Sequence, residues 1–482
     1  LRIPGIGPKR ASRLFHEAGV TTARQLVGAA RAGRLSAMKG FGPGTEADML
    51  QAASAYLASG HRWKLSVAAQ RAEAIAQYLR EAEGIASLDI AGSYRRQQET
   101  VGDLDILVCA DQSTAVTHRF LAYPEVARVL SQGPTRSSVV LKNGLQIDLR
   151  VVKPESFGAA LVYFTGSKAH NLALRRIAQK GGLKINEYGV YRGARCIAGN
   201  TEPSVYATLG LPPIPPELRE NRGEIESARH HQLPALIERT DLRGDLHVHT
   251  DASDGHASFA AMVGAARKAG LAYVAITDHS RGLSVAHGLD ADRLARQIDL
   301  IDRFNETSSD IVVLKGIEIE ILEDGTLDLP ASMLRRLDLV VGAVHSHFKL
   351  SRPRQTERIM RAMDQPCFSI LAHPTGRLIG EREPYAVDLE RLIRHASERK
   401  CFLEANAHPD RLDLNDIGCR MARDGGVQVA ISSDSHDENG YTALRFGVGQ
   451  ARRGWLECKD VVNTLSWKEL RARLKATMAG AS

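Results

Sequence analysis

The sequence predicts a multidomain α/β protein whose C-terminal half is a distorted β/α barrel. At 482 residues the chain is too long for one ordinary core, so about two to four domains are expected. From residue 245 onward, short apolar strand-like runs alternate with helical patterns, which is typical of βα units and a parallel sheet. Potential metal ligands stand in blocks that each look like the end of a strand, and the rim of a barrel would gather such blocks.

Nine residues of the C-terminal half are candidate metal ligands. They are His247, His249, Asp254, His279, Glu318, His345, His373, Asp434 and His436. A mixed set of imidazoles and carboxylates suits a cluster of zinc or manganese ions better than a single structural zinc ion. A phosphate bound across such a cluster would have its charge neutralised, so the nine residues predict a multimetal phosphoesterase site.

Other polar residues near these blocks are expected to have different roles. Asp245 and Asp278 are expected to orient neighbouring imidazoles. Arg377 and Lys349 are candidates for contact with phosphate. Four lone histidines are expected to be surface or core residues and not ligands: His256, His287, His347 and His408.

Composition and charge limit the class of protein. The 43% hydrophobic and 25% charged fractions are those of a soluble globular protein, and neither a membrane span nor a signal peptide is present, so a cytoplasmic location is expected. The six cysteines form no CxxC pair and are expected to be buried thiols. The formal charge is +7, and residues 1–60 contain eight Lys or Arg against three Asp or Glu, which suggests a polyanion partner.

Residues 1–60 read as short helices separated by two glycine-rich turns, PGIGPK and KGFGPGT. Such turns suit a helix-hairpin-helix, in which glycines let the backbone approach a phosphate and helix amides bind it. Two copies beside a net basic charge favour non-specific binding to the DNA backbone. The expected DNA-binding residues are Gly5, Gly7, Lys9, Gly40, Gly42 and Thr45. The chain begins at Leu1 and not at Met, and an N-terminal part is expected to be missing.

The most specific stretch of the front half is GSYRRQQETVGDLDILV. It follows a helix expected at about 66–83, and Asp103 and Asp105 lie two apart in a strand-like run, so both carboxylates are expected on one face. Asp148, in the strand-like LQIDLR, can complete the set from a neighbouring strand. Two-metal nucleotidyl transfer needs this arrangement, because one ion activates the attacking hydroxyl and the other steadies the leaving group. Upstream, a Gly-Ser turn and Arg95-Arg96 offer donors for phosphate oxygens.

This stretch resembles the palm of a family X DNA polymerase, and the block FGAALVYFTGSKAHNLALRRIAQKGGLKINEYGVY resembles that family's nucleotide-selecting segment. The resemblance implies nucleotide-binding roles for eight residues. They are Ser93, Arg96 and Gly102 for the triphosphate, Tyr163, Phe164 and Gly166 beside the sugar, Asn171 at the base, and Arg175 at the templating strand. Two positions depart from the family pattern: Val101 replaces a hydroxyl found in some members, and Gln97 stands where glycine is frequent.

The C-terminal half resembles a PHP (polymerase and histidinol phosphatase) domain. Together, the resemblances imply a DNA-directed DNA polymerase that fills short gaps in DNA repair and has a metal-dependent 3′-5′ exonuclease or 3′-end phosphoesterase activity. The implied divisions are a helix-hairpin-helix segment at 1–60, a nucleotidyltransferase palm at 61–155, a thumb at 156–225, a linker at 226–244 and the PHP domain at 245–482.

The same resemblances imply cofactors and partners. Mg²⁺ or Mn²⁺ is expected at Asp103, Asp105 and Asp148, and a cluster of two or three Zn²⁺ and/or Mn²⁺ ions at the PHP site. Primer-template or gapped DNA and deoxynucleoside triphosphates are the expected partners, and a monomer is expected. Two alternatives stay open: a small-molecule phosphoesterase akin to histidinol phosphatase, and a DNA-binding protein with a structural metal cluster.

Overall fold

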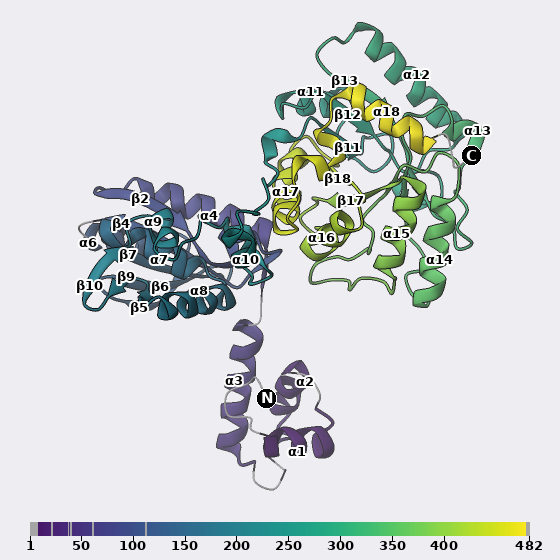
Figure 1. Ribbon diagram of the computed structural model, residues 1–482. Helices are drawn as coiled ribbons and strands as arrows, with labels where there is room; N and C mark the ends of the chain where they lie inside the picture. The colour runs from purple at the N-terminus through teal and green to yellow at the C-terminus, as the bar shows by residue number, and fades with distance from the viewer. Residues whose placement is uncertain are drawn as a thin grey trace.

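The computed structural model describes residues 8–20, 23–36, 38, 41–59, 62–110 and 113–478. Figure 1 shows three regions along the chain: a small N-terminal group of helices that lies apart, a mixed α/β unit, and a larger C-terminal unit of strands surrounded by helices. None of the described helices combines the length and the apolar character that a membrane span requires.

The N-terminal region consists of three helices around a small apolar core. The helices are α1 (Pro8–Ala18), α2 (Ala23–Arg31) and α3 (Pro43–Ser59). Leu14, Leu26 and Phe41 are buried at their junction. The carboxylate of Glu46, in the first turn of α3, accepts the backbone N–H groups of Leu35 and the next residue at 2.7 Å each, which fixes the connection to α2.

A five-stranded mixed sheet with strand order β2-β4-β7-β6-β5 forms the middle unit. Its strands are β2 (Ile85–Ile90), β4 (Asp103–Ala110), β5 (Val126–Gln132), β6 (Arg136–Leu141) and β7 (Gln146–Val152). Two helices, α4 (Leu65–Arg80) and α6 (Ser113–Leu121), pack on one face. On the other face Leu107 contacts Ala160 and Leu161. Because strand residues alternate between faces, Asp103 and Asp105 share the face of Leu107.

The segment that follows folds against this sheet. It contains α7 (Phe157–Thr165), α8 (Lys168–Lys180), a three-stranded antiparallel sheet, α9 (Glu202–Ala207) and α10 (Glu224–Arg229). The strands of the small sheet are β8 (Lys184–Asn186), β9 (Gly189–Arg192) and β10 (Arg195–Ala198). A Cβ atom at Gly158 would lie 2.1 Å from the backbone of Thr201, so only glycine permits the observed contact between α7 and the start of α9.

Eight parallel strands form the centre of the C-terminal unit. They are β11 (Gly244–Val248), β12 (Tyr273–Ile276), β13 (Val312–Lys315), β14 (Glu318–Glu320), β15 (Val341–Ala343), β16 (Ile370–Leu371), β17 (Phe402–Asn406) and β18 (Val429–Ser432). The expected single barrel is not closed: within the described residues β11 to β13 form one sheet and β14 to β18 a second. Isolated parallel bridges, Val248 with Ser435 and His279 with Glu318, join the sheets.

The two sheets enclose one apolar interior. Leu246 and Tyr273 of the first sheet and Val341 and Ile370 of the second belong to the same buried cluster. Residues on the alternate face of the strands pack against the surrounding helices, as expected for parallel strands that are buried on both sides. The helices are α11 (Phe259–Lys268), α12 (Ala291–Thr307), α13 (Ala331–Leu334), α14 (Arg352–Met363), α15 (Leu389–Arg399), α16 (Asp416–Asp424), α17 (Leu444–Arg453) and α18 (Trp467–Met478).

The middle and C-terminal units share apolar cores. Ala443 and Phe446 of the C-terminal unit are buried in the same cluster as α4 and the mixed sheet. Trp455 is buried among residues of α7 and α8. Segment 226–244, expected to be a linker, includes the end of α10, and its Leu236 forms an antiparallel bridge with Glu457. Residues 62–110 and 113–478 therefore form one continuous packed body.

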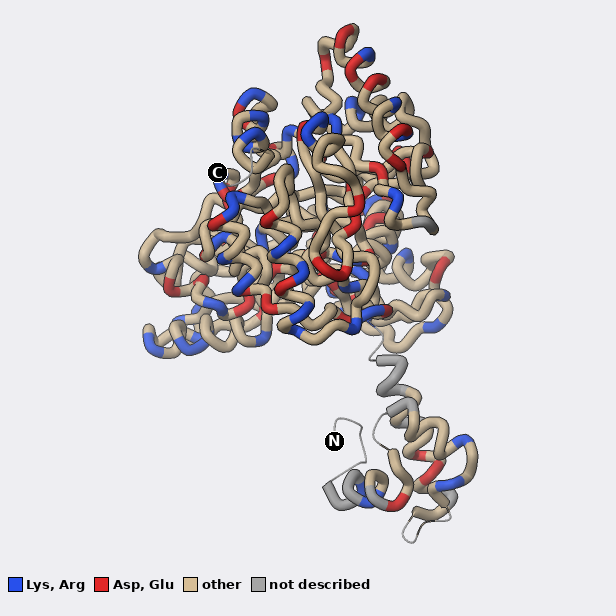
Figure 2. The backbone as a smooth tube through the Cα atoms, turned by 90° about the vertical axis from the view of Figure 1, so that its right-hand side faces the viewer, with Lys and Arg blue, Asp and Glu red and all other residues tan. Residues whose placement is uncertain are grey.

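The surface carries charges of both signs. In Figure 2, Lys and Arg are scattered among Asp and Glu through the backbone of the large body. All six cysteines are without disulfide bonds. The expectation that all are buried is wrong for Cys196 and Cys458, which are exposed because they lie on a short outer strand and in a surface turn.

An ion-pair group connects the middle unit to α9. Arg95 donates two hydrogen bonds to Glu202, at 2.8 and 2.7 Å, and Arg219, which is 1% exposed, donates another at 2.7 Å. Burial alone would raise the pKa of Glu202, but the two guanidinium groups outweigh it and lower that pKa to about 2.

Glu202→Gln should lower the free energy of unfolding by about 3 to 5 kcal/mol at pH 7, because it leaves a buried guanidinium without its partner. The pKa of Glu202 in the folded protein lies below its ordinary value. Its ion pairs therefore contribute fully to the free energy of unfolding above about pH 5, and this contribution is lost as the pH falls towards 2. Thermal unfolding at pH 7 and pH 3 tests this. The control is Glu226→Gln, which removes an exposed pair on α10. If Glu202→Gln lowered the free energy of unfolding by the same amount at pH 7 and at pH 3, the stabilising role of the ionised Glu202 carboxylate would be contradicted.

Candidate functional site

The three candidate catalytic aspartates lie on two adjacent interior strands of the mixed sheet, β4 and β7. In the parallel pairing of β4 with β7, Asp105 is the register partner of Asp148, and Asp103 lies two residues earlier on β4. Gln146 donates to Asp148 Oδ1 at 3.0 Å, and Arg136 Nη2 lies 3.6 Å from Asp148 Oδ2. The structure therefore places the three carboxylates on neighbouring strands, as the sequence predicts.

The aspartates repel one another electrostatically. Burial, and then the charges of Asp103 and Asp148, raise the pKa of Asp105 to about 7. Burial and Asp148 also raise the pKa of Asp103. Three neighbouring carboxylates that repel one another fit hard divalent cations, because such cations bind oxygen ligands and would neutralise the negative charge of the group. Among the described residues, some groups of potential ligands have ligand atoms that all lie within 4.8 Å of one another, and the triad is not one of these groups. Its three carboxylates are therefore more widely spaced than the ligands of a closed metal cage.

A turn between β2 and β4 contacts the triad. Gly92 has φ +66°, and a Cβ atom there would lie 2.7 Å from Asp105 Oδ2, so glycine is needed for the close approach. Gly92 begins the short helix α5 (Gly92–Arg95), which contains Ser93. Arg96 follows and donates to Glu220 at 2.9 Å and to the carbonyl of Thr165 at 2.5 Å. Of the expected triphosphate residues, Ser93 follows Gly92 and Gly102 directly precedes Asp103, whereas the side chain of Arg96 is bonded to Glu220 and Thr165.

The expected nucleotide-selecting residues lie on α7, on α8 and in the turn between them. Tyr163 and Phe164 meet edge to face with ring centroids 5.0 Å apart. Gly166 ends α7 with φ +70°. The side chain of Asn171 donates to the carbonyl of Tyr163 at 2.7 Å, and the guanidinium of Arg175 lies 5.3 Å from the Tyr163 ring centroid.

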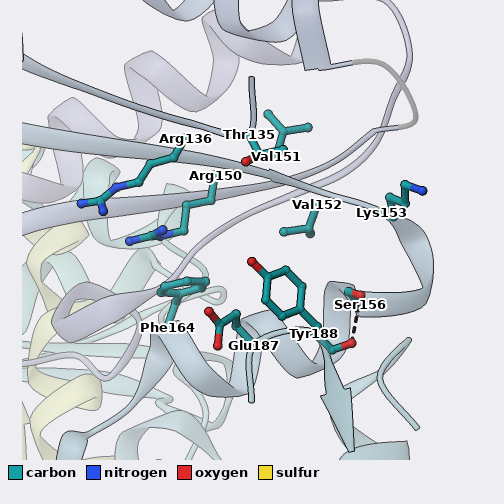
Figure 3. Close-up of a pocket in the computed structure, with 10 residues that line it drawn as sticks. All are labelled: Thr135, Arg136, Arg150, Val151, Val152, Lys153, Ser156, Phe164, Glu187 and Tyr188. Carbon is teal, nitrogen blue, oxygen red and sulfur yellow. Dashed lines mark hydrogen bonds between the residues drawn. The ribbon is translucent and has the colours of Figure 1, made fainter. Parts of the chain in front are cut away.

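A pocket has a volume of about 340 Å³. It is lined on one side by the start of β6 and the end of β7, and on the other by the turn that precedes β9. In Figure 3 the guanidinium groups of Arg136 and Arg150 point in the same direction, and the ring of Phe164 lies against Arg150. The guanidinium carbon of Arg150 is 4.0 Å from the centroid of Phe164. Because Arg136 also reaches Asp148, this basic pocket borders the aspartate triad.

Five of the nine candidate ligands of the C-terminal unit surround a sixth, Glu318, and the other three contact these histidines or one another. Its carboxylate oxygens lie 2.9 to 3.4 Å from ring nitrogens of His247, His249, His279, His345 and His373. Asp434 Oδ1 lies 3.3 Å from His249 Nε2. Asp254 oxygens lie 3.4 Å from His279 and 3.5 Å from His436. Glu318 begins β14, whereas the sequence suggested that every ligand block closes a strand.

Three groups within this set have ligand atoms that all lie within 4.8 Å of one another. They are His249, Asp254, His279 and His436; His247, His249 and Glu318; and His279, Glu318 and His345. Several buried atoms make no hydrogen bond, including both ring nitrogens of His249, Nε2 of His247 and Oε2 of Glu318. Buried polar atoms without partners that face one another fit a cluster of divalent metal ions.

Two carboxylates that were not foreseen hold the imidazoles. Glu404 Oε1 lies 2.7 Å from His247 Nδ1, and Glu320 Oε2 lies 2.9 Å from His345 Nδ1. Such partners fix the ring orientation and leave Nε2 for a metal. Asp245, in contrast, accepts backbone N–H groups of His247 and Ser433.

Asp278 is likewise not an imidazole partner, because it accepts from Thr250, Ser253 and Gln297. Arg377 does not face the cluster: it donates to the carbonyls of two residues, 411 and 412, and pairs with Glu99 of the middle unit at 2.7 Å. Arg411 is the basic residue found beside the cluster, with Nε 3.4 Å from Asp434.

The expected DNA-binding turns are only partly visible. Gly5, Gly7 and Gly40 lie outside the described residues. Lys9 lies in α1, and Thr45 lies in the first turn of α3. Gly42 precedes α3 and is exposed.

Four family models match the chain in order along the sequence. A SAM-like helix-hairpin-helix tandem matches residues 1–55, the DNA polymerase beta palm 66–177, the DNA polymerase beta thumb 160–220 and the PHP domain 245–408.

Curated proteins and solved structures also match. The DNA polymerase/3′-5′ exonuclease PolX of Bacillus subtilis is 38% identical over 479 residues, which cover 98% of this chain and 84% of that protein. A probable phosphatase of Caldanaerobacter subterraneus subsp. tengcongensis is 31% identical over 205 residues, or 40% of this chain and 75% of that protein. The ternary gap complex of Leishmania infantum polymerase beta is 20% identical with a TM-score of 0.34 and covers 45% of this chain and 87% of that chain.

His249→Asn should lower the content of transition-metal ions per chain, because His249 contributes to two of the three ligand groups and is fully buried. Elemental analysis after gel filtration in metal-free buffer measures the content. The matched control is His347→Asn, whose ring is half-exposed and lies 3.6 Å from Glu323. A metal content equal to that of the unaltered protein would rule out His249 as a ligand.

Proposed function

Because the chain belongs to the family X DNA polymerases that carry a PHP domain, we propose that it fills short gaps in DNA during repair and processes 3′ ends at a second site. The second activity is a metal-dependent 3′-5′ exonuclease or 3′-end phosphoesterase. The observation that supports the proposal is that two groups of potential metal ligands, the aspartate triad and the histidine-rich cluster, lie on one packed body.

At the first site Asp103, Asp105 and Asp148 would hold Mg²⁺ or Mn²⁺, which supplies activation of the attacking hydroxyl and neutralises charge on the triphosphate. The protein's own residues position the nucleotide. Ser93, Arg96 and the backbone of Gly102 face the triphosphate, and the absence of a side chain at Gly92 lets this turn lie against Asp105.

The remaining residues of the first site contact the sugar, the base and the template. Tyr163 and Phe164 pack against the sugar, and Gly166 gives the backbone room to turn. Asn171, already held by the carbonyl of Tyr163, presents its amide group to the base. Arg175 reaches the templating strand.

At the second site the nine ligands would hold two or three Zn²⁺ and/or Mn²⁺ ions, which supply a hydroxide and neutralise the scissile phosphate. Glu404 and Glu320 keep the rings of His247 and His345 in the orientation that directs Nε2 inward. Arg411 adds a positive charge at the rim, where a phosphate oxygen would arrive.

The proposed partners are primer-template or gapped DNA and deoxynucleoside triphosphates, with a cytoplasmic monomer as the working form. The net positive charge of residues 1–60 supports binding of the DNA backbone by the helix-hairpin-helix turns. A small-molecule phosphoesterase is less well supported, because the same chain also contains the aspartate triad and the residues around Arg96.

Asp103→Ala should abolish nucleotide addition and leave 3′-end digestion intact, because only the first site uses this carboxylate. His247→Ala combined with His249→Ala should abolish digestion and leave addition intact. Primer extension on a one-nucleotide gap and digestion of a labelled 3′ end, both in Mn²⁺, measure the two activities.

The exposed His347→Ala serves as the control and should retain both activities. Full-rate 3′-end digestion by the double histidine variant would show that the second site is elsewhere. Loss of both activities in Asp103→Ala would show that the two sites are not separable.

A further inference from the structure

The turn that precedes the aspartate triad, residues 92–98, is contacted by α17 of the PHP domain. Gln450 donates from Nε2 to the carbonyl of Gln97 at 2.9 Å, and Arg453 donates from Nη1 to the carbonyl of Arg96 at 2.7 Å. Both donors are almost fully buried, with exposed fractions of 1% and 4%. Two consecutive carbonyls of the turn are therefore bonded to side chains of the other catalytic domain.

Arg453 also acts on the side chain of Arg96 through a shared carboxylate. Glu220 Oε1 accepts from Arg96 Nε at 2.9 Å and from Arg453 Nη1 at 3.0 Å. Burial alone would raise the pKa of Glu220, but the charges of Arg96 and Arg453 outweigh it and lower that pKa. The second amino group of Arg453 donates to Asp416 at 2.8 Å, which fixes the direction of the guanidinium.

The backbone of the turn requires outside support. Gln97 has φ +54°, a left-handed conformation that favours glycine. Its side chain lies against Gly449, where a Cβ atom would come within 2.8 Å of Gln97 Oε1. Helix α17 is itself fixed on the strands of the metal cluster, because a Cβ atom at Gly447 would lie 2.8 Å from Ile431 of β18.

We propose that Arg453 is a positioning residue of the polymerase site, which aligns Arg96 for the incoming triphosphate. The proposal rests on the triphosphate-binding role of Arg96 in the proposed function. Arg453 neutralises part of the charge of Glu220 and fixes the Arg96 backbone. Gln98 Nε2 also donates to Glu220 Oε1, at 2.6 Å, but its amide is neutral. Without Arg453, Arg96 is therefore the one cation among these three donors, and its guanidinium is held more strongly by Glu220 and is less available to phosphate oxygens.

The experiment measures KM for the nucleotide and kcat separately, on a one-nucleotide gap with saturating DNA, together with the rate of 3′-end digestion. Arg453→Gln in the full chain should raise KM by about tenfold, because it removes charge-assisted hydrogen bonds, with a smaller change in kcat. Arg453→Lys should recover part of the loss. Digestion should be unchanged, which also shows that the variant is folded.

Arg452→Gln is the matched control on the same helix. Arg452 pairs with Glu217 and donates to the carbonyl of Ile237, and neither contact involves the turn 92–98, so KM should not change. In a double-mutant cycle, the effect of Arg453→Gln should shrink when Glu220→Gln is already present, because much of it passes through that carboxylate.

The second variant, Gln450→Met, removes only the bond to Gln97 and should raise KM by about fivefold. The inference would be overturned if Arg453→Gln had the same KM for the nucleotide as Arg452→Gln. It would also be overturned if the effects of Arg453→Gln and Glu220→Gln on KM simply added in the double variant. If the unaltered protein incorporates no nucleotide, the proposed function fails instead, so the two failures are distinguishable.

Discussion

One buried carboxylate determines how the C-terminal unit is assembled. Glu318 is 1% exposed, and charge burial of this kind is tolerated only with close positive or metallic partners. Five imidazoles lie within 3.4 Å of it: one is in β11, and the others follow β11, β12, β15 and β16. The strands must therefore meet at one rim, even though their hydrogen bonding leaves two separate sheets. Metal ions held in this group would relieve the electrostatic cost and stabilise the same arrangement.

The two catalytic halves are joined by apolar packing and not only by a chain segment. Phe446 completes the core beneath the mixed sheet, and Trp455 completes the core of the α7–α8 region. Ion pairs such as Lys64 with Asp410 and Arg377 with Glu99 surround these contacts. Because such a boundary buries large side chains from both sides, the polymerase-like half and the PHP half are expected to unfold together.

Features with a local pattern could be predicted from the sequence. Asp103 and Asp105 were assigned to one face by the two-residue period of a strand, and the helix expected at about 66–83 corresponds to α4, Leu65–Arg80. The register that brings Asp148 opposite Asp105 depends on the pairing of β4 with β7, and the sequence indicated only that a third strand carboxylate was available.

Features set by long-range packing could not be predicted. Strand β5, Val126–Gln132, went unnoticed because it lies at the sheet edge with six of its seven residues exposed, so no alternation marks it. Glu404 and Glu320 look like ordinary strand residues until folding brings them to an imidazole. Arg377 pairs with Glu99 of the middle unit, which is far from it in the sequence, and no local pattern around Arg377 indicates that partner.

The shared core has a mechanical consequence for the proposed pair of activities. A mismatched 3′ end must travel from the aspartates to the histidines, and in a packed body that distance is fixed by the fold. The DNA end therefore has to move while the protein stays fixed. Its terminal bases must unpair, leave their phosphate contacts at the aspartates and bind again at the histidines. Proofreading of this kind is governed by the melting of the primer terminus and by ionic strength, and not by a swinging domain.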